Sequence, residues 1–419
     1  MDQDKPQSPK TILILTADAG FGHRSAANAV AAAFENEYKD VCKAVIVNPL
    51  EDKRSPFFLR ESQSDYDKIV KNMPELYKFG YEASDAAVPV AIVESALTVL
   101  LYEAIRDILN EYQPDAILTT YPLYQAPVNA FLTISGHNIP FFTVVTDLAT
   151  VHRIWFNKNV DGCIVPNETV RDLAVANGVP EKNVFIKGIP VHPKIVGETR
   201  SKQEIRKELG WEPDIPTFLA VGSKRVEGLS RILHVVNHFG APLQLAVVAG
   251  KDNELYEQLQ AIQWHIPAHL YEFTSDMPLL MHGSDAIICK AGGLIVTEAL
   301  ASRLPMILID VIPGQEEGNA DYVTTNGAGD LAGSIEEALE IIAHLLMNNS
   351  ALLKERAGNA AALSKPFAAQ EIAGMVYQST LQRSGTAQKH RLANRPTFIK
   401  LLTQNQISWQ GETHEPTRE

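Results

Sequence analysis

Two neighbouring loops of this sequence combine the residue types that bind a phosphorylated sugar. The first, Lys290-Ala-Gly-Gly-Leu-Ile-Val-Thr-Glu298, follows an apolar run and opens a predicted helix. Backbone amides near Gly292 and Gly293 can hold a diphosphate, because glycine permits close approach and a helix N-terminus favours negative charge. Glu298 can accept hydrogen bonds from both hydroxyls of a ribose. An exposed glutamate that only complements the helix dipole is the alternative.

The second loop, Pro313-Gly-Gln-Glu-Glu-Gly-Asn319, follows the next predicted strand. Its amide and carboxylate groups suit the hydroxyls of a sugar. Both loops follow strands of one sheet, so we expect them at the same edge, where open α/β sheets bind ligands. The segment from Lys290 to Asn319 is therefore predicted to bind a sugar nucleotide.

A third loop, Asp18-Ala-Gly-Phe-Gly-His-Arg-Ser25, lies between the first apolar run and the first predicted helix. Gly20 and Gly22 let the backbone approach a ligand, and His23 can act as a general base near neutral pH. A simple turn with a capping or core histidine fits the same residues. The loop lacks the third glycine of a dinucleotide fingerprint, and no clear acid follows about twenty residues on, which weakens a dehydrogenase interpretation.

Alternating strands and helices must position these loops. Apolar runs predict strands at 11–16, 44–47, 116–119, 141–145, 163–165, 217–221, 245–248, 269–273, 286–289 and 305–310. Helices are predicted between them, among them 25–34 and a long amphipathic helix over 92–109. This alternation predicts parallel, doubly wound sheets.

The length of 419 residues predicts two α/β domains, each Rossmann-like. Periodicity is lost near 188–200, where prolines and glycines indicate a linker, and Ser201 and Glu204 form a predicted capping box after it. We therefore expect a polar segment over 1–10, an N-terminal domain over 11–190 that faces the acceptor and membrane, a linker over 191–200, a C-terminal donor domain over 201–381 and a polar tail over 382–419.

Composition excludes several classes of protein. The net charge of -13 argues against wholesale binding of nucleic acid. Cys42, Cys163 and Cys289 are too far apart for a disulfide framework or a CxxC metal site, and are predicted to lie in the core. The polar start has no apolar signal region and no window is apolar enough to cross a bilayer, so we expect the cytoplasm, with the protein peripheral on the inner face of the cell membrane if it meets one.

Several segments together resemble one enzyme family. The run KAGGLIVTEALASRLPMILIDVIPGQEEGNADYVTTNGAG is similar to the donor-binding region of the monogalactosyldiacylglycerol synthases and processive diacylglycerol glucosyltransferases. GFGHRSAANAV, YQPDAILTTYP and VVTDLATVHRIW resemble three further segments, and the similarity runs from about Thr11 to about Tyr377. More distantly the chain resembles the peptidoglycan N-acetylglucosaminyltransferase. The resemblance implies the GT-B fold, with two Rossmann-like domains facing each other across a cleft.

The resemblance also implies roles for individual residues. Gly292, Gly293 and Thr297 would contact the diphosphate and Glu298 the ribose. Gln315 and Glu316 would hold sugar hydroxyls, with Asn319 close behind, and Phe273, Ser275 and Met277 match the family segment near the nucleobase. The remaining donor-side positions would be Gly20, Gly22 and Gly222.

On the opposite side of the cleft, the resemblance implies that His23 is the catalytic base and that Asp147 is a second catalytic residue. His152 would line the acceptor side. A structural role for Asp147, capping the segment around Thr150, fits the sequence equally well.

One loop departs from the family pattern. Where the family has a glycine-rich loop after the first C-terminal strand, this chain has Val221-Gly-Ser-Lys-Arg-Val226. Lys224 and Arg225 could stabilise the leaving diphosphate by direct charge, or could simply face solvent.

The implied reaction is an inverting displacement in which helix N-termini and basic side chains replace a metal, so no metal or other cofactor is expected. The formal DxD at Asp2 and Asp4 precedes any strand and is discounted.

The acceptor is implied by the resemblance alone. It would be diacylglycerol or a glycosyl-diacylglycerol at a membrane surface, with a UDP-sugar as donor. Basic and aromatic residues beside an apolar stretch between Lys68 and Leu109 fit a segment that faces the bilayer, although acidic residues dilute the charge and a core helix explains the apolar run equally.

Three alternatives stay open at this point. A GT-B transferase with a non-lipid acceptor, a UDP-sugar 2-epimerase and a catalytically silent sugar-nucleotide sensor each fit two Rossmann-like domains. The identity of the hexose, processivity and the oligomeric state are not predicted.

Overall fold

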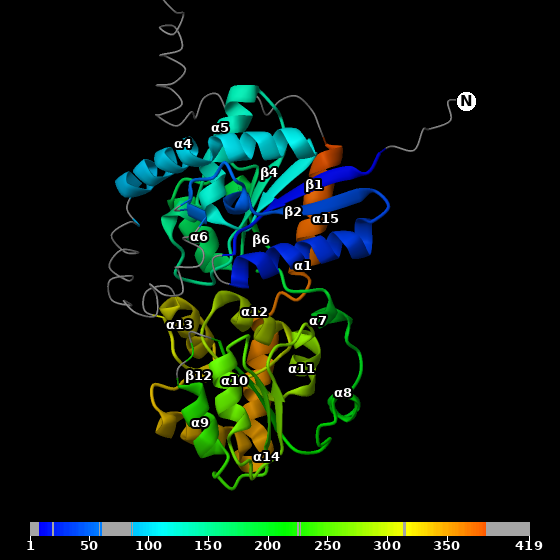
Figure 1. Ribbon diagram of the computed structural model, residues 1–419, viewed down its shortest axis with the longest axis vertical. Helices are drawn as coiled ribbons and strands as arrows, with labels where there is room; N and C mark the ends of the chain where they lie inside the picture. Colours follow the sequence, from blue (N-terminus) through cyan, green and yellow to red (C-terminus); the bar gives the residue numbers. More distant parts are fainter. Residues whose placement is uncertain are drawn as a thin grey trace, which may run out of the picture.

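The computed structural model describes residues 8–18, 21–57, 59–60, 85, 87–223, 226, 228–312 and 316–382. These residues form two lobes, each built on one parallel six-stranded sheet (Figure 1). The upper lobe in Figure 1 holds the first sheet and the lower lobe the second. The predicted architecture of two Rossmann-like domains is confirmed.

The N-terminal sheet has the order β2-β1-β3-β4-β5-β6. Its strands are β1 (Lys10–Leu15), β2 (Cys42–Val47), β3 (Ala116–Thr119), β4 (Phe141–Val144), β5 (Gly162–Val165) and β6 (Val184–Ile186). The helices around it are α1 (Phe21–Tyr38), α4 (Ala87–Tyr112), α5 (Gln125–Ser135) and α6 (Glu168–Ala176), with 3-10 helices at Pro49–Glu51, Pro122–Tyr124, Arg153–Trp155 and Glu181–Asn183. Strands β1, β3, β4 and β5 are almost wholly buried because helices cover both faces of the sheet.

The C-terminal sheet has the order β12-β11-β10-β7-β8-β9. Its strands are β7 (Thr217–Val221), β8 (Gln244–Val248), β9 (Ala268–Tyr271), β10 (Ala286–Cys289), β11 (Met306–Leu308) and β12 (Gly329–Leu331). Its helices are α8 (Lys202–Leu209), α9 (Leu229–Val236), α10 (Asn253–Gln260), α11 (Met277–Gly283), α12 (Gly293–Ala301), α13 (Glu317–Thr325) and α14 (Ile335–Leu363), which is kinked at 347–350. A short helix, α7 (Lys194–Gly197), lies in the predicted linker.

Strand order reverses once in each sheet, and this determines where ligands can bind. In the first sheet β1 pairs with both β2 and β3, and in the second β7 pairs with both β8 and β10. The connections leave to opposite sides at these points, which opens a crevice beyond the carboxyl ends of the strands. The loop before His23 follows β1, and the loop before Gly292 follows β10, so both predicted loops lie at such a point.

The last described helix, α15 (Ala368–Leu381), corrects the predicted domain boundary. It had been assigned to the C-terminal domain, yet it packs against α1 and β3 of the upper lobe (Figure 1). Ala369, Ile372, Ala373 and Val376 belong to the same buried cluster as the apolar residues of β1 and α1. The small side chains of α1 and α15 let the two helices lie close together, so the chain returns to the first domain to bury this face.

Several local predictions are confirmed and two strands were missed. Ser201 and Glu204 form the expected capping box, with Ser201 N donating to Glu204 Oε2 at 2.8 Å. The three cysteines are buried and free. Strands β6 and β12 were not predicted, because each has only three residues and lies at a sheet edge.

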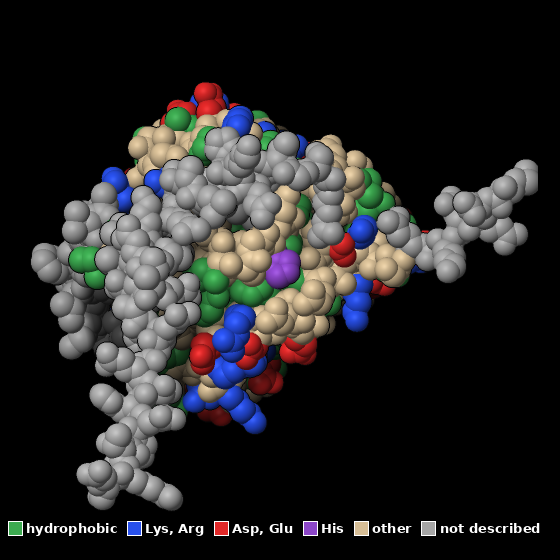
Figure 2. Space-filling view, turned by 90° about the horizontal axis from the view of Figure 1, so that it is seen from above, with side chains coloured by type: hydrophobic (Ala, Val, Ile, Leu, Met, Phe, Trp, Pro, Cys, Tyr) green, Lys and Arg blue, Asp and Glu red, His purple; other side chains and the backbone are tan. Residues whose placement is uncertain are grey.

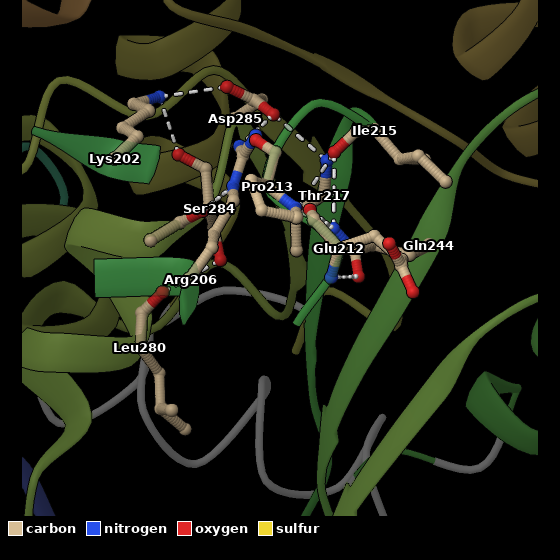
Figure 3. Close-up of polar contacts among 11 residues, drawn as sticks. Lys202, Arg206, Glu212, Pro213, Ile215, Thr217, Gln244, Leu280, Ser284 and Asp285 are labelled. Carbon is tan, nitrogen blue, oxygen red and sulfur yellow. Dashed lines mark hydrogen bonds and ion pairs between the residues drawn. The ribbon is translucent and has the colours of Figure 1, made fainter. Parts of the chain in front are cut away.

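A buried charge network joins α8 to the central strands of the C-terminal sheet (Figure 3). Asp285 accepts hydrogen bonds from Thr217 N at 2.8 Å and Lys202 Nζ at 3.0 Å, and it forms an ion pair with Arg206. Arg206 is only 4% exposed, and its Nε donates to Gly283 O at 2.7 Å. Each charge is therefore paired and hydrogen-bonded, as a buried ion requires.

Replacing Asp285 by Asn should destabilise the protein by about 2 kcal/mol, because the buried Arg206 would lose its counter-charge. Urea unfolding followed by circular dichroism measures the change. Lys202→Met is the matched control and should cost less than about 1 kcal/mol, since that side chain is 42% exposed. Equal losses for the two variants would contradict a special role for the Arg206 pair.

The face of the upper lobe seen in Figure 2 carries mixed charge where its residues are described. Seen from the end of the upper lobe, basic and acidic side chains are interspersed, and the coloured atoms form no continuous basic surface (Figure 2). No helix among the described residues is long and apolar enough to cross a membrane.

Candidate functional site

His23 lies in the first turn of α1, at the carboxyl end of the N-terminal sheet. Its ring is half-buried between Tyr121 and Trp155, with ring centroids at 5.0 Å and 5.9 Å. Its Nδ1 lies 3.1 Å from Thr146 Oγ1, and its backbone carbonyl accepts a hydrogen bond from Thr120 Oγ1 at 2.9 Å. The ring is therefore held on one nitrogen, which leaves Nε2 available for chemistry.

Burial lowers the pKa of His23 to about 4. A protonated imidazole loses hydration in this apolar surrounding, so the neutral form is favoured. At neutral pH the ring is uncharged, which is the form that a general base requires.

Asp147 lies next to this site but does not hydrogen-bond His23. Its Oδ2 accepts from Trp155 Nε1 at 3.2 Å. Burial raises the pKa of Asp147 to about 7, with a smaller raising effect of the Glu316 charge and against the lowering effect of the hydrogen bond from Trp155. Asp147 thus contacts the indole beside His23, whereas the side chain hydrogen-bonded to the imidazole is Thr146.

His152 caps the 3-10 helix that carries Trp155. Its Nδ1 accepts from Ile154 N at 3.1 Å and lies 3.7 Å from Asp85 Oδ1. Burial lowers the pKa of His152, against a raising effect of the Asp85 charge. The residue predicted to line the acceptor side therefore also supports the wall beside His23.

The predicted diphosphate loop caps α12. Gly292 is the N-cap residue in an extended conformation, and among the residues that the structure describes no side chain caps this helix. The Thr297 hydroxyl donates to Gly293 O at 2.6 Å, within the helix. These amides are the groups that a helix N-terminus offers to an anion.

Glu298 stands on α12 directly after Thr297. It is half-buried, and burial raises its pKa to about 7. Within the described part of the chain its carboxylate has no hydrogen-bond or ion-pair partner. A carboxyl group that loses hydration without gaining a protein partner is suited to a ligand that supplies hydroxyl donors.

Sequence reasoning did not identify the role of Lys290. Its Nζ lies 2.6 Å from Glu316 Oε1, and Glu316 Oε2 accepts from Ile312 N at 3.3 Å. Glu316, predicted to hold sugar hydroxyls, is only 4% exposed and shares its acceptor capacity with this lysine. The position of Lys290 in the sequence could have indicated a role in the site, since it directly follows a buried strand at the point where the strand order reverses.

Asn319, predicted to belong to the donor site, is hydrogen-bonded to both domains. Its Oδ1 accepts from Leu148 N at 3.1 Å, and its Nδ2 donates to Ala291 O at 3.0 Å. It is 1% exposed, and its amide joins the two domains. Sequence alone could not show this, because the partner lies 171 residues away.

Glycines bring the two domains close at the same place. A Cβ on Gly293 would lie less than 3.0 Å from Thr146 O, and one on Gly318 would meet Thr150 equally closely. Gly22 faces Leu294 of α12 at an ordinary contact distance. Two of these three glycines therefore have a packing function between domains, beyond any approach to a ligand.

Gly222 is accounted for by packing within the C-terminal domain. Its N–H donates to Val248 O at 2.8 Å, and a Cβ there would collide with Leu255. Its amide extends the sheet and is not free for a phosphate. Gly20, Lys224, Arg225 and Gln315 lie outside the described residues.

The predicted nucleobase segment follows β9. Phe273 is 53% exposed, and Lys251 Nζ lies 4.5 Å from its ring centroid. Ser275 is exposed, and Met277 is half-buried as the first residue of α11. An exposed aromatic ring beside the loops that end β8 and β9 can stack on a planar base.

The anchoring of the loop before His23 was also missed. Asp18 accepts two hydrogen bonds from Arg24 at 2.8 Å each, and Asn48 Nδ2 donates to Asp18 at 3.3 Å. The Arg24 contact lowers the pKa of Asp18. The two ends of the loop are thus joined across the start of α1.

No group of acidic, histidine or cysteine side chains that could hold a metal ion occurs among the described residues.

Comparison with known sequences divides the chain as its two lobes do. Residues 23–191 match the family model described as monogalactosyldiacylglycerol (MGDG) synthase, and residues 217–372 match the glycosyltransferase family 28 C-terminal domain. A probable chloroplastic monogalactosyldiacylglycerol synthase of Glycine max is 33% identical over 388 residues, covering 90% of this chain and 73% of that relative.

Solved structures resemble the whole two-lobed arrangement. MurG of Acinetobacter baumannii has a TM-score of 0.58 at 14% identity, covering 88% of this chain and 100% of its own. UDP-GlcNAc 2-epimerase of Neisseria meningitidis, bound to UDP-GlcNAc, has a TM-score of 0.56 at 12% identity, covering 89% and 100%. At these identities the likeness concerns the fold alone.

Proposed function

Because this chain belongs to the monogalactosyldiacylglycerol synthase family of glycolipid glycosyltransferases, we propose that it transfers a hexose from a UDP-sugar to diacylglycerol or a glycosyl-diacylglycerol. One observation carries the proposal. A neutral histidine at the start of α1 and the uncapped N-terminus of α12 lie on opposite sides of one domain junction. A base and an anion site are the two groups that such a transfer needs.

The proposed reaction is a single displacement with inversion. His23 Nε2 accepts the proton of the acceptor hydroxyl while that oxygen bonds to the anomeric carbon. The bond from this carbon to the diphosphate breaks, and its electron pair stays on UDP. The first amides of α12 and the ammonium of Lys290 stabilise the leaving charge, so the proposal assigns no step to a metal.

Donor binding is proposed to centre on Glu298 and the Gly292–Gly293 amides. The pKa of Glu298, raised by burial, and its lack of a partner among the described residues support a bound ribose. Lys290 and Glu316 lie beside Gly292, where they would meet the diphosphate and the sugar. The Neisseria epimerase, which has the same fold, binds UDP-GlcNAc, and this supports a UDP-sugar as the donor.

The acceptor is proposed to reach the site from a membrane surface beside α4. Three apolar side chains on the N-terminal half of this helix are exposed: Ile92 by 65%, Val93 by 37% and Val99 by 56%. An exposed apolar helix face is suited to the boundary between headgroups and acyl chains. Residues 68, 71 and 78, the lysines of the predicted membrane-facing segment, lie outside the described residues. The relative's chloroplastic location belongs to that relative, and a peripheral position on the inner face of the cell membrane stays a proposal for this chain.

Replacing Ile92 and Val99 together by Asp should reduce flotation with anionic liposomes by at least about fivefold, because two charges would have to enter the lipid boundary. Flotation at low salt measures this. The matched control, Leu331→Asp, changes an exposed apolar residue of the other lobe and should float like the wild type. Equal flotation of all three proteins would contradict the α4 surface.

The reaction itself is tested by product analysis. The protein is incubated with UDP-glucose or UDP-galactose and diacylglycerol vesicles, and mass spectrometry with NMR identifies the lipid product and its anomeric configuration. A glycosyl-diacylglycerol of inverted configuration is expected. Formation of an epimerised UDP-sugar without acceptor, or transfer only to soluble acceptors, would overturn the proposal.

A further inference from the structure

We propose that Thr146 is a positioning residue, which orients the imidazole of His23 and couples that orientation to the donor-binding loops. This inference rests on the proposed function. Thr146 follows β4 and is only 5% exposed. Its hydroxyl oxygen lies 3.1 Å from His23 Nδ1, and within the described residues it is the only side chain hydrogen-bonded to the ring.

A hydroxyl partner suits a histidine that must act as a base. For Nε2 to accept a proton, the proton of the neutral ring must reside on Nδ1, from which it can be donated to Thr146 Oγ1. When Nε2 is protonated, the same Nδ1–H bond is kept. The ring therefore changes charge without rotating, and the neighbouring rings of Tyr121 and Trp155 need not move.

The backbone of Thr146 is attached to the donor side at the same time. Its carbonyl lies against Gly293, where any larger residue would collide with it. Two residues later, Leu148 donates its amide hydrogen to Asn319 and buries its side chain in the hydrophobic cluster of the C-terminal domain. Asn319 in turn donates to Ala291 O, next to the diphosphate loop.

These contacts make 146–148 a direct connection between base and donor. The hydroxyl holds the imidazole, while the carbonyl and the following amide are held by the loops that begin α12 and α13. A shift of the donor loops would move Thr146 and with it His23 Nε2. Because reacting groups must meet within a narrow geometry, this connection would align the base with the anomeric carbon.

Asp147, the acidic residue next to Thr146, does not orient the imidazole of His23. The carboxylate of Asp147 accepts a hydrogen bond from the indole of Trp155 and none from the imidazole of His23. Thr146, and not Asp147, is therefore assigned the role that a carboxylate has in many catalytic histidine pairs.

The test compares Thr146→Val, which keeps the shape and removes the hydroxyl, with Thr146→Ser, which keeps the hydroxyl. We expect Thr146→Val to lower kcat by roughly 10- to 100-fold, with the donor KM within about twofold, and Thr146→Ser to stay within about fivefold of wild type. Thr143→Val is the matched control, because Thr143 lies in β4 with a buried hydroxyl that has no hydrogen-bond partner in the described part of the chain. It should leave kcat unchanged.

A second measurement does not depend on turnover. In protein labelled with nitrogen-15 histidine, the ring-nitrogen shifts of His23, identified by their absence in His23→Gln, should report a proton on Nδ1 in the wild type. In Thr146→Val the proton should move towards Nε2, whereas Thr143→Val should match the wild type.

The outcomes separate this inference from the proposed function. Equal kcat for Thr146→Val and Thr143→Val in an active enzyme, or a wild-type ring protonated on Nε2, would overturn the role of Thr146 and leave glycosyl transfer intact. If the wild type transfers no hexose to any lipid tested, the proposed function fails, and the ring-nitrogen shifts still decide whether Thr146 orients His23.

Discussion

Replacing His23 by Ala should lower kcat by about a thousandfold while UDP-hexose binds with an unchanged dissociation constant. The reason is positional. His23 lies at the start of α1 in the N-terminal domain, whereas the groups proposed to bind the donor lie in the loops after β10 and β11. Steady-state kinetics with a diacylglycerol acceptor gives kcat, and isothermal calorimetry gives donor affinity.

The matched control is His344→Ala, which removes an exposed histidine of α14 and should leave both quantities unchanged.

The pH dependence of the rate is a second test of His23 as the base. Burial lowers the pKa of His23 to about 4, so the base form should persist well into acid and the wild-type rate should fall through this group only near pH 4. Substantial turnover by His23→Ala, or loss of donor binding together with turnover, would contradict its assignment as the base.

Glu298→Ala should weaken UDP-hexose binding by roughly 100-fold, because two charge-assisted hydrogen bonds to a ribose would be lost.

The carboxyl group of Glu298 should also make donor affinity depend on pH. Burial raises the pKa of Glu298 to about 7 in the empty protein, and ribose hydroxyls favour the ionised form. Donor affinity should therefore rise roughly tenfold between pH 6 and pH 8. Calorimetric titrations with UDP-glucose at several pH values measure both effects.

Two variants make this prediction specific. Glu298→Gln should bind the donor weakly at every pH, with the rise between pH 6 and pH 8 removed. Glu340→Gln, which neutralises an exposed carboxylate of α14, should behave as the wild type. An unchanged pH slope in Glu298→Gln would assign the titration to another group, such as Asp147, and unchanged affinity would remove Glu298 from the donor site.

Much of the fold could be predicted because the information is local. Continuous apolar runs such as those of β1, β7 and β10 are typical of strands buried on both faces, and the breaks between them hold the expected turn and capping residues. The capping box at Ser201 is a pattern of four residues and needs no tertiary contact to be recognised. The long helix α4 was predicted for the same reason, from repeated apolar spacing.

The elements that escaped prediction depend on distant partners. Strands β6 and β12 are too short to show periodicity and exist because the sheet edge offers hydrogen-bond partners. Helix α15 follows the C-terminal domain in sequence, but its small apolar face matches that of α1. The sequence of 368–381 alone does not indicate whether this helix packs on the C-terminal domain or on α1 of the N-terminal domain.

Some features of the candidate site could also be predicted from local sequence, whereas others depend on distant partners. The segment from Lys290 to Glu298 could be proposed as an anion site from sequence, because a strand, a glycine pair and a helix in succession favour anion binding, and the structure places this segment at the start of α12. His23 could likewise be named from its loop. Only the tertiary structure shows that Asn319 joins the domains, that Glu316 is paired with Lys290 and that Thr146 contacts the imidazole. The physical reason is that hydrogen-bond partners are decided by how two separately encoded domains pack, over separations of 171 residues for Asn319 and 123 for Thr146.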